Sequence, residues 1–301
     1  MEAWIVITIV AAFLQNLRSA AQKYLKRVMG TTGATFVRFG FGLPFAALYV
    51  LILHLVIDYP IPSPTPMFFL WVVIGGVSQI AATFLLVYLF SFRNFAVGTA
   101  YSRTEPAQAA LFGVLFLGET VTSGVLTAIG ISVVGVMLIS VAHMTVSART
   151  LVTSMFSRTS MIGLMSGTCF GVSAVSYRAA SLSLGGPNFM MQAAATLAVV
   201  ILFQTVVMIG WMVVREPEEL GRIRKAWKPS LFVGLVGASA SFGWFMAMTL
   251  QQAAVVKALA QVEMIFTFAS SVWFFRERIN ALEIAGCTLI VVGILTLIAI
   301  G

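Results

Sequence analysis

Two glutamates stand inside apolar segments of this sequence, where little besides other side chains can solvate a carboxylate. Glu105 lies in AYSRTEPAQAALFGVLFLGE, with Arg103 two residues before it and Pro106 directly after it. Glu263 lies in KALAQVEMIFTFASSVWFFRE, 158 residues further along. An ionisable side chain at mid-membrane depth costs about 2.5–3.5 kcal/mol on insertion scales and marks a functional site by default. Both carboxylates are therefore candidate binding groups for a proton or for a charged group of a substrate.

The neighbours of these glutamates limit how their charges can be satisfied. Arg103 and Glu105 are about 200° apart around a helix, so they cannot easily pair with each other. Each then needs a partner from another helix or from a substrate, which favours a polar cavity at the centre of the protein. Burial disfavours the charged form of a carboxyl group, and this favours proton binding. The alternative is a permanent ion pair with Arg38, Arg103 or Lys257 that fixes helix packing.

Further side chains in apolar segments are candidates for the lining of such a cavity. Arg38 could bind a substrate carboxylate or phosphate through its fork of N–H donors, or it could pair with one of the two glutamates. Lys257 and Gln261 share one helix face, although Lys257 could instead extend to the membrane surface. The other candidates are Gln79, Tyr88, Tyr101 and Trp244. Aromatic side chains in membrane helices also serve in packing and in interfacial belts.

Four other charged side chains are assigned no role in binding. Arg18 and Arg178 stand toward the ends of apolar segments, and we expect them to extend to the membrane surface. Glu119 and Glu277 lie at the ends of their segments, and we expect them to be structural.

Composition identifies the elements that must position these residues. Of 301 residues, 60% are hydrophobic and 9% are charged, with a mean hydropathy of +1.01, whereas soluble domains carry about 25% charged residues. The chain is therefore a polytopic membrane protein. A membrane-spanning helix needs about 20 apolar residues, and ten segments meet this length: Ala3–Ala21, Thr32–Val56, Thr65–Phe90, Phe95–Leu117, Val121–His143, Ser160–Ser183, Pro187–Val214, Ser230–Leu250, Ala253–Phe275 and Ile279–Ile300. Within the fourth segment, Pro106 leaves the carbonyl of Ser102 without its helical N–H partner.

The sequence repeats itself at a constant offset of 158 residues. Matching pairs include Gly76 and Gly234, Ala96 and Ala254, Val97 and Val255, Ala100 and Ala258, Glu105 and Glu263, Phe116 and Phe274, Glu119 and Glu277, and Gly135 and Gly293. The first five segments then overlie the second five. Because five is odd, the second copy is inverted relative to the first, and substrate sites of inverted repeats lie near the bilayer midplane. Met264 stands where the first copy has Pro106, so only the first copy carries a helix-breaking residue there.

Loop charges predict how the chain is oriented. Of 18 Lys and Arg, 13 lie in or next to the odd-numbered connections: Lys23, Lys26, Arg27, Arg93, Arg149, Arg158, Arg215, Arg222, Arg224, Lys225, Lys228, Arg276 and Arg278. The positive-inside rule places these connections in the cytoplasm and both termini outside it. The bases are too few and too close to helix ends to indicate nucleic-acid binding, despite a net charge of +8. Cys169 and Cys287 fall in apolar segments, so no disulfide is expected.

Two halves of five helices, each with a fourth helix that runs from a mid-membrane Glu to a terminal Gly-Glu or Arg-Glu, resemble the EamA-type permeases of the drug/metabolite transporter superfamily. The likeness is carried by Thr104–Thr120 (TEPAQAALFGVLFLGET) and Val262–Ile279 (VEMIFTFASSVWFFRERI). We therefore expect an all-α integral membrane protein of ten transmembrane helices, built as two inverted five-helix repeats (1–145 and 160–301) joined by a connecting loop (146–159). The resemblance implies that spans five and ten pack outside a cavity lined by the others. The family is commonly described with cytoplasmic termini, contrary to the loop charges.

The resemblance also implies a function. We expect a secondary transporter that works by alternating access and exports a small polar or amphipathic metabolite such as an amino acid, with a proton-coupled drug or metabolite antiporter as the alternative. Its partners would be the small-molecule substrate and the lipid bilayer of a bacterial inner membrane, and it would be a monomer or a dimer. An intramembrane enzyme is disfavoured because HExxH and G-x-S-x-G are missing and His54 and His143 are far apart. A channel would use ringed selectivity elements. We expect no catalytic residue, cofactor or metal.

Overall fold

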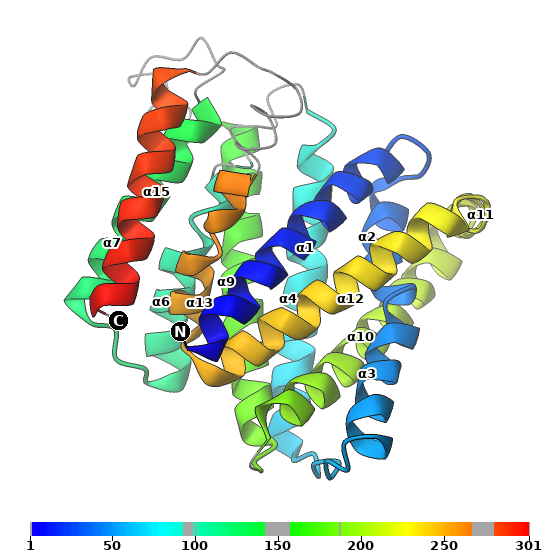
Figure 1. Cartoon of the computed structure of the whole chain (residues 1–301). Helices are drawn as coiled ribbons and strands as arrows, with labels where there is room; N and C mark the ends of the chain where they lie inside the picture. Colours follow the sequence, from blue (N-terminus) through cyan, green and yellow to red (C-terminus); the bar gives the residue numbers. More distant parts are fainter. Residues whose placement is uncertain are drawn as a thin grey trace.

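Helices form all the regular structure in the residues that the computed structural model describes, which are 2–92, 99, 101–141, 157–186, 188–266 and 280–300 (Figure 1). Seven of the described helical segments are long and apolar enough to cross a membrane. They are α1 (Ala3–Leu25), the succession of α2 (Thr31–Gly40) and α3 (Leu43–Leu55), α4 (Pro66–Leu89), α9 (Arg158–Ser183), α10 (Phe189–Arg215), α12 (Trp227–Leu250) and α15 (Ala281–Ile300). The shorter helices are α6 (Glu105–Leu117), α7 (Ser123–Val141), α11 (Pro217–Lys225) and α13 (Ala253–Leu259). Many large hydrophobic side chains are exposed on the outside, as a lipid-facing surface requires.

The first half of the chain contains two helix breaks, of which the sequence indicated only the one at Pro106 in the fourth expected helix. The second expected helix is interrupted between α2 and α3. In the fourth, Arg103 and Thr104 form a turn and α6 begins at Glu105, so these charged residues do not lie inside one continuous helix. Pro106 occupies the first turn of α6, where a backbone N–H has no helical partner in any case. The proline therefore starts a helix there and does not disrupt one.

The second half breaks at the matching place without a proline. After α13, Ala260 and Gln261 form a turn, and the helix resumes over 262–266. The absence of a proline at Met264 was therefore a poor guide to helix continuity. The following parts of the expected spans lie outside the described residues: 95–98 and 100 of the fourth, 142–143 of the fifth, 187 of the seventh, and 267–275 and 279 of the last two.

The helices of the two halves are packed between one another. At the offset of 158, α1 corresponds to α9 and α4 corresponds to α12. In the structure α1 lies along α12, and α4 lies along α9 (Figure 1). The first helix of each half therefore packs against the third helix of the other half. Neither half buries this surface by itself.

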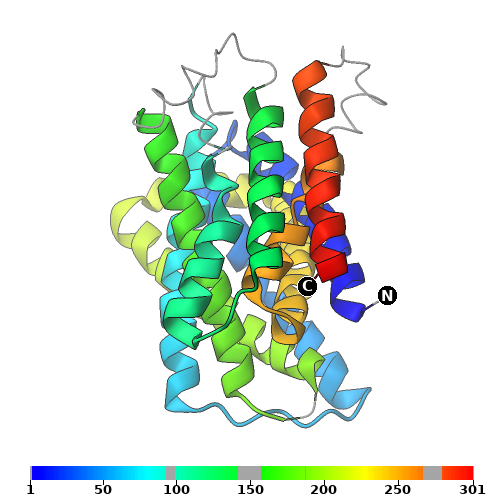
Figure 2. The ribbon, with the colours of Figure 1, turned by 90° about the vertical axis from the view of Figure 1, so that its left-hand side faces the viewer.

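The outer helices α7 and α15 run in opposite directions side by side (Figure 2). Glycine lets their backbones touch: a β-carbon on Gly135 would lie 2.7 Å from the carbonyl oxygen of Gly286, and one on Gly286 would lie 2.6 Å from the carbonyl oxygen of Gly135. Such small residues permit close packing where no hydrophobic effect drives helices together. The contact recurs at Gly293, where a β-carbon would lie 2.9 Å from the carbonyl oxygen of Ala128.

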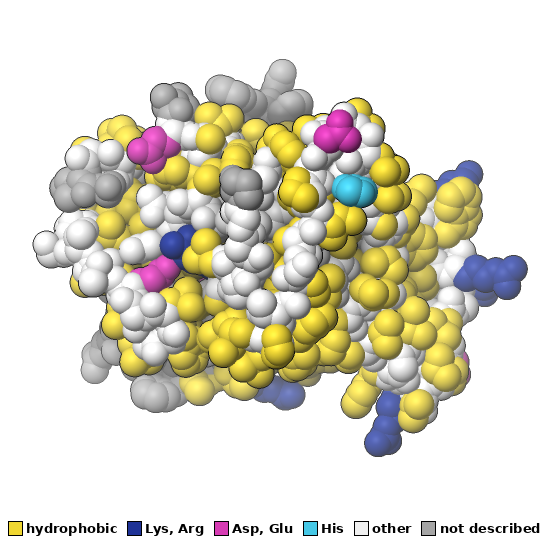
Figure 3. Space-filling model, turned by 90° about the horizontal axis from the view of Figure 1, so that it is seen from below, with side chains coloured by type: hydrophobic (Ala, Val, Ile, Leu, Met, Phe, Trp, Pro, Cys, Tyr) yellow, Lys and Arg dark blue, Asp and Glu magenta, His cyan; other side chains and the backbone are white. Residues whose placement is uncertain are grey.

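The short helix α11 follows α10 directly and packs against the start of α2 at one end of the helices. The carboxylate of Glu219 accepts a hydrogen bond of 2.8 Å from the backbone N–H of Gly30, at the start of α2, and forms an ion pair with Arg222. A carboxylate is favourable there because of the helix dipole. The α3–α4 connection lies at the opposite end (Figure 1), where charged side chains are sparse (Figure 3). The basic connection α10–α12 is thus folded and tied to α2.

The close contact at Gly135 predicts that a larger side chain destabilises the protein there but not at Gly130 of the same helix. Gly135→Leu should lower the free energy of unfolding by about 1–3 kcal/mol, because the side chain has no room at the α15 backbone. Gly130→Leu, also on α7, should have little effect, since Gly130 is exposed and has nothing within 4 Å of its β-carbon position. Thermal unfolding in detergent measures both. Equal melting temperatures would show that the close contact is absent.

Candidate functional site

Two ion pairs connect the halves of the protein at its broken helices. Arg103 pairs with Glu263 through two contacts, Nη1 to Oε2 and Nη2 to Oε1, each 2.9 Å long. Nζ of Lys257 lies 2.8 Å from Oε1 of Glu105. The contact between Lys257 and Glu105 is an ion pair whose angles fall outside hydrogen-bond geometry. The basic residue of each half thus holds the carboxylate of the other half.

The helix breaks give these charges favourable positions. Glu105 is the first residue of α6, and Glu263 is the second residue of the 262–266 helix, so both carboxylates stand at the positive ends of helices. Lys257 lies in the last turn of α13, near the negative end of that helix. Half-helices whose ends meet at the centre of the membrane bind charged groups in many secondary transporters.

The centre of this arrangement lies between two residues of equal register. Gln261 is 158 positions after Arg103, and its Nε2 donates a hydrogen bond of 3.4 Å to the carbonyl oxygen of Arg103. The two ion pairs therefore lie at a place where equivalent positions of the two halves meet.

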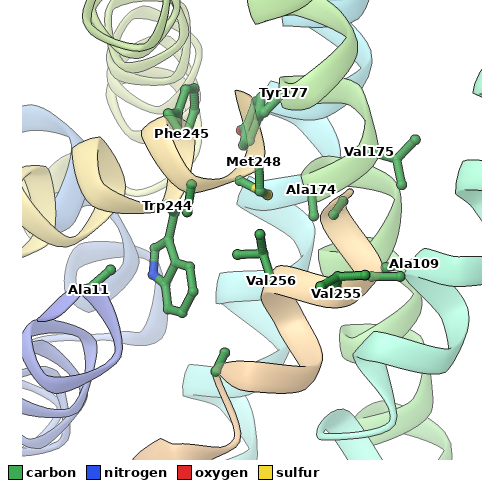
Figure 4. Packing of buried hydrophobic residues seen from close by; sticks show 14 of the residues in the cluster. Ala11, Ala109, Ala174, Val175, Tyr177, Trp244, Phe245, Met248, Val255 and Val256 are labelled. Carbon is green, nitrogen blue, oxygen red and sulfur yellow. The ribbon is translucent and has the colours of Figure 1, made fainter. Parts of the chain in front are cut away.

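Polar side chains from α1 and α12 support the pair made by Glu263. Nε2 of Gln15 donates to Oε2 of Glu263 at 3.0 Å, and Nε1 of Trp244 donates to Oε1 of Gln15 at 3.0 Å. Nζ of Lys257 lies 4.7 Å from the centre of the Trp244 ring, a cation–π distance. Figure 4 shows Trp244 between Ala11 of α1 and Val256 of α13. Glu263 is 3% exposed and Glu105 15%, so Glu263 is the more buried of the two carboxylates, although its partner Arg103 is 26% exposed.

A second polar cluster is centred on Arg38. Its Nη1 donates to Thr83 Oγ1 at 3.1 Å, and its Nη2 donates to Ser241 Oγ at 3.3 Å. Close by, Gln79 accepts from Nε2 of Gln204 at 2.9 Å. The hydroxyl of Tyr177 lies 3.0 Å from Oε1 of Gln79.

Two narrow cavities adjoin these clusters. Each has about 20 Å³ open to the centre of a water molecule, enough for one or two waters. The first is lined by Gln15, Arg38, Gln79, Phe170, Ser173, Ala174, Tyr177, Ser241, Trp244, Phe245, Met248 and Lys257, and the second by Gln15, Arg103, Glu105, Pro106, Lys257, Ala260 and Gln261. Gln15 and Lys257 border both. As the described residues line them, both spaces are too narrow for a metabolite, and in that sense the site is closed.

The structure brings together most of the side chains that the sequence pointed to. Glu105, Glu263, Arg103, Lys257, Gln261 and Trp244 form the central group, and Arg38 and Gln79 lie around the neighbouring cavity. Tyr88 does not line either cavity: it stacks on Phe84, and its hydroxyl accepts from Arg158 at 3.4 Å. Tyr101 is buried outside both linings.

Two alternatives that the sequence left open are not found, and one expectation is wrong. Arg38 does not pair with either glutamate, because its described hydrogen bonds go to hydroxyl groups. Lys257, 11% exposed, forms an ion pair and does not extend to the membrane surface. Arg18 does not reach the surface either, since it is 3% exposed.

Arg178 also turns inward. Its Nε pairs with Glu119 at 2.6 Å, and its Nη1 donates to the carbonyl oxygens of Met248 and Gln251, at the end of α12. Glu119 is thus part of a contact between α9 and the end of α6, which agrees with a structural role. Glu277 lies outside the described residues.

The residues that support the charged side chains could not be recognised in the sequence. Gln15, Tyr177, Gln204 and Ser241 were not among the candidate binding residues. Their only signal was a polar group inside an apolar span, which many packing residues share. Gln204 is fully buried in α10, where an amide must find partners within the protein.

These features define a membrane protein of many helices with charged pairs at its core. The sequence matches the model of the EamA-like transporter family over residues 2–141 and again over residues 158–299. The chain belongs to this family, which consists of transporters and not enzymes, so it is a multi-pass membrane protein with a small-molecule substrate. Because one model matches both halves, the chain carries an internal repeat.

Comparison with solved structures agrees with this fold. A structure described only as "Crystal structure of protein" covers 98% of this chain and 96% of its own, with a TM-score of 0.66 and 15% sequence identity. At that identity the likeness shows the fold alone. A search of curated proteins found no match.

The two ion pairs predict that removing the charge of Glu263 destabilises the protein more than removing the charge of Glu105. Glu263→Gln should lower the free energy of unfolding by about 3–5 kcal/mol, because it leaves the guanidinium of Arg103 without its counter-charge. Glu105→Gln should have a smaller effect, since Glu105 is more exposed and makes a single contact to a flexible lysine. Thermal unfolding of the purified variants measures the difference.

Two further variants serve as controls for this prediction. Removing both charges in Arg103→Met/Glu263→Met should restore much of the stability that Glu263→Gln loses. Glu218→Gln should change nothing, because Glu218 is 84% exposed. A Glu263→Gln variant as stable as Glu218→Gln would contradict the assignment.

Proposed function

We propose that this protein is a secondary transporter that moves a small polar or amphipathic metabolite, such as an amino acid, by alternating access. The observation that carries the proposal is the reciprocal pair of contacts, Arg103 to Glu263 and Lys257 to Glu105. They connect the two halves at the point where both helices are broken. Charged groups there can exchange partners with a substrate while the halves rock around them. Export as the direction of transport follows the family resemblance.

We further propose ten transmembrane helices in two inverted repeats, 1–145 and 160–301, joined by 146–159. The first helix of each half packs on the third helix of the other half, α1 on α12 and α9 on α4, and this supports the symmetry. The α7–α15 contact supports it as well: Gly135 meets Gly286, and their equivalents at the offset of 158 are Gly293 and Ala128, which also meet. Because α7 and α15 are antiparallel, an axis relating them is perpendicular to the helices and lies in the membrane plane. This is the axis of an inverted repeat.

The closed cavities define what the cycle has to do. A substrate needs more space than the about 20 Å³ open to water centres in each cavity, so the helices around it must separate on one side of the membrane. Separation of the halves stretches the ion pairs and exposes their charges. A substrate with its own charged groups can replace the lost contacts, so that the transition is easier when the substrate is bound.

Proton-coupled antiport is the second candidate, and Glu105 is the residue that favours it. Its carboxylate borders a cavity, and within the described chain its one contact is the ion pair with Lys257. A carboxyl group that loses this partner in an apolar site favours its neutral form. Proton binding at Glu105 would then alternate with the ion pair.

Counterflow measures the carrier function. Liposomes that contain the protein and an unlabelled mixture of amino acids should transiently accumulate labelled amino acids from outside, because a carrier exchanges bound substrate. A channel would only equilibrate them. Glu105→Gln should remain folded and abolish the flux, while Glu218→Gln should leave it unchanged. Full activity of Glu105→Gln and Glu263→Gln together would exclude a role for the two carboxylates.

The orientation can be tested independently. We propose that the protein lies in a bacterial inner membrane with both termini outside the cytoplasm, because the basic residues gather in the odd-numbered connections. A reporter that is active only in the cytoplasm, fused at Gly301, should be inactive, and one that is active only outside should be active. The opposite result would place the termini in the cytoplasm and show that the loop charges do not set the topology.

A further inference from the structure

Arg18 is a buried cation without a counter-ion. Its side chain is 3% exposed, and neither Nε nor Nη1 has a hydrogen-bond partner among the residues that the structure describes. A guanidinium group does not lose its proton under physiological conditions, so the charge persists. Keeping an unpaired charge away from water is strongly unfavourable. A further, negatively charged group is therefore needed to neutralise Arg18.

Arg38 lies beside Arg18 and is also without a carboxylate. Within the described chain, neither arginine has a carboxylate oxygen within 4.0 Å, and Arg38 donates only to neutral hydroxyl groups. The two stems flank Gly237: a β-carbon there would lie 3.4 Å from Cδ of Arg18 and 3.4 Å from Cγ of Arg38. Two like charges in the same buried region repel each other, and an anion that lies near both relieves the repulsion.

The charges of this region do not balance among the described residues. Arg38, Arg103 and Lys257 line the two cavities, and Arg18 lies beside Arg38 without lining either. These four basic side chains accompany two carboxylates (Glu105 and Glu263), which leaves an excess of two positive charges. Both carboxylates are already held by Arg103 and Lys257. They attract Arg18 only from beyond ion-pair distance. An incoming cation would find no free carboxylate, whereas an incoming anion would find two unpaired arginines.

We infer that Arg18 and Arg38 bind the carboxylate or phosphate group of an anionic substrate. The inference rests on the carrier function proposed above and adds the chemical class of the compound carried. Forked N–H donors match the geometry of both oxyanions, and the bonds are strengthened by charge. A substrate with up to two negative charges would neutralise the excess.

The surroundings of Arg38 indicate how the rest of such a substrate is held. Arg38 lines its cavity together with Trp244 and Phe245, whose rings offer a surface for an apolar part. Lys257 borders this cavity and the one at Glu105, so the polar lining continues from Arg38 to the ion pairs. Opening of the closed cavity would precede binding.

The test is thermal stabilisation of the purified full-length protein by defined anions at constant ionic strength. Succinate and inorganic phosphate at tens of millimolar should each be compared with succinamide, the uncharged counterpart of succinate, and with chloride. We expect at least one of the two oxyanions to raise the melting temperature, and succinamide and chloride to have no comparable effect. The stronger of the two identifies the carboxylate or the phosphate class. An equal effect of chloride would show a simple counter-ion site and overturn the proposal, as would no effect of either oxyanion.

Variants separate binding from folding. Arg18→Gln should make the stabilising anion bind at least about tenfold more weakly, yet should not lower the melting temperature of the anion-free protein, because it removes an unpaired charge. A structural arginine would show the reverse: a lower melting temperature and an unchanged anion response. Arg18→Lys keeps the charge without the fork and should retain part of the response. Arg222→Gln, a half-exposed arginine on α11, is the matched control and should respond as the unmodified protein does.

Counterflow with labelled succinate or phosphate distinguishes failure of this inference from failure of the carrier proposal. Anion binding without counterflow would contradict the carrier function and leave the anion site standing. Counterflow of a neutral or cationic compound that Arg18→Gln does not affect would support the carrier and overturn the anion site.

Discussion

A charge within a bilayer has to be neutralised by the protein or its ligand, because no water is present to solvate it. In this protein the constraint determines how the halves are joined. Each half contributes one base and one glutamate at a broken helix, and each base reaches the glutamate of the other half. Separating the halves would expose four charges at once. The same contacts that hold the structure closed are therefore those that a transport cycle has to rearrange.

The positions of the helix breaks decide which partner each charged side chain can reach. If α6 extended through Arg103 without interruption, Arg103 and Glu105 would point to opposite sides of one helix. The turn at Arg103 and Thr104 instead presents the guanidinium to Glu263 while Glu105 begins a new helix toward Lys257. Breaks of this kind are possible at membrane depth because the freed backbone groups find partners inside the protein, as the carbonyl of Arg103 does at Gln261.

Much of the fold and the central residues could be predicted from the sequence, because hydropathy and the offset of 158 are properties of the chain itself. Glu105 and Glu263 could be singled out by residue type and depth alone. Arg38, Arg103 and Lys257 could be named as candidate partners, but which base holds which glutamate could not be predicted, since pairing depends on which helices meet. The contact with Gln15 could not be predicted either, because α1 packs on α12 and not within its own half. Arg18 was misplaced for a related reason. Its helix continues to Leu25, so a residue that seemed close to a span end is buried.

The contact between Arg103 and Gln261 has a consequence for how such a chain can arise. The two residues are one position in two copies of the repeat, and they are in contact. In an ancestral pair of identical chains assembled in this way, each arginine at that position would face the glutamate of the other chain, because Glu105 and Glu263 are equivalent. A symmetric pair would therefore hold two such ion pairs. Arginine on one side and glutamine on the other require that the copies mutate independently, so fusion of the duplicated genes, or their divergence into separate partners, had to come before this difference.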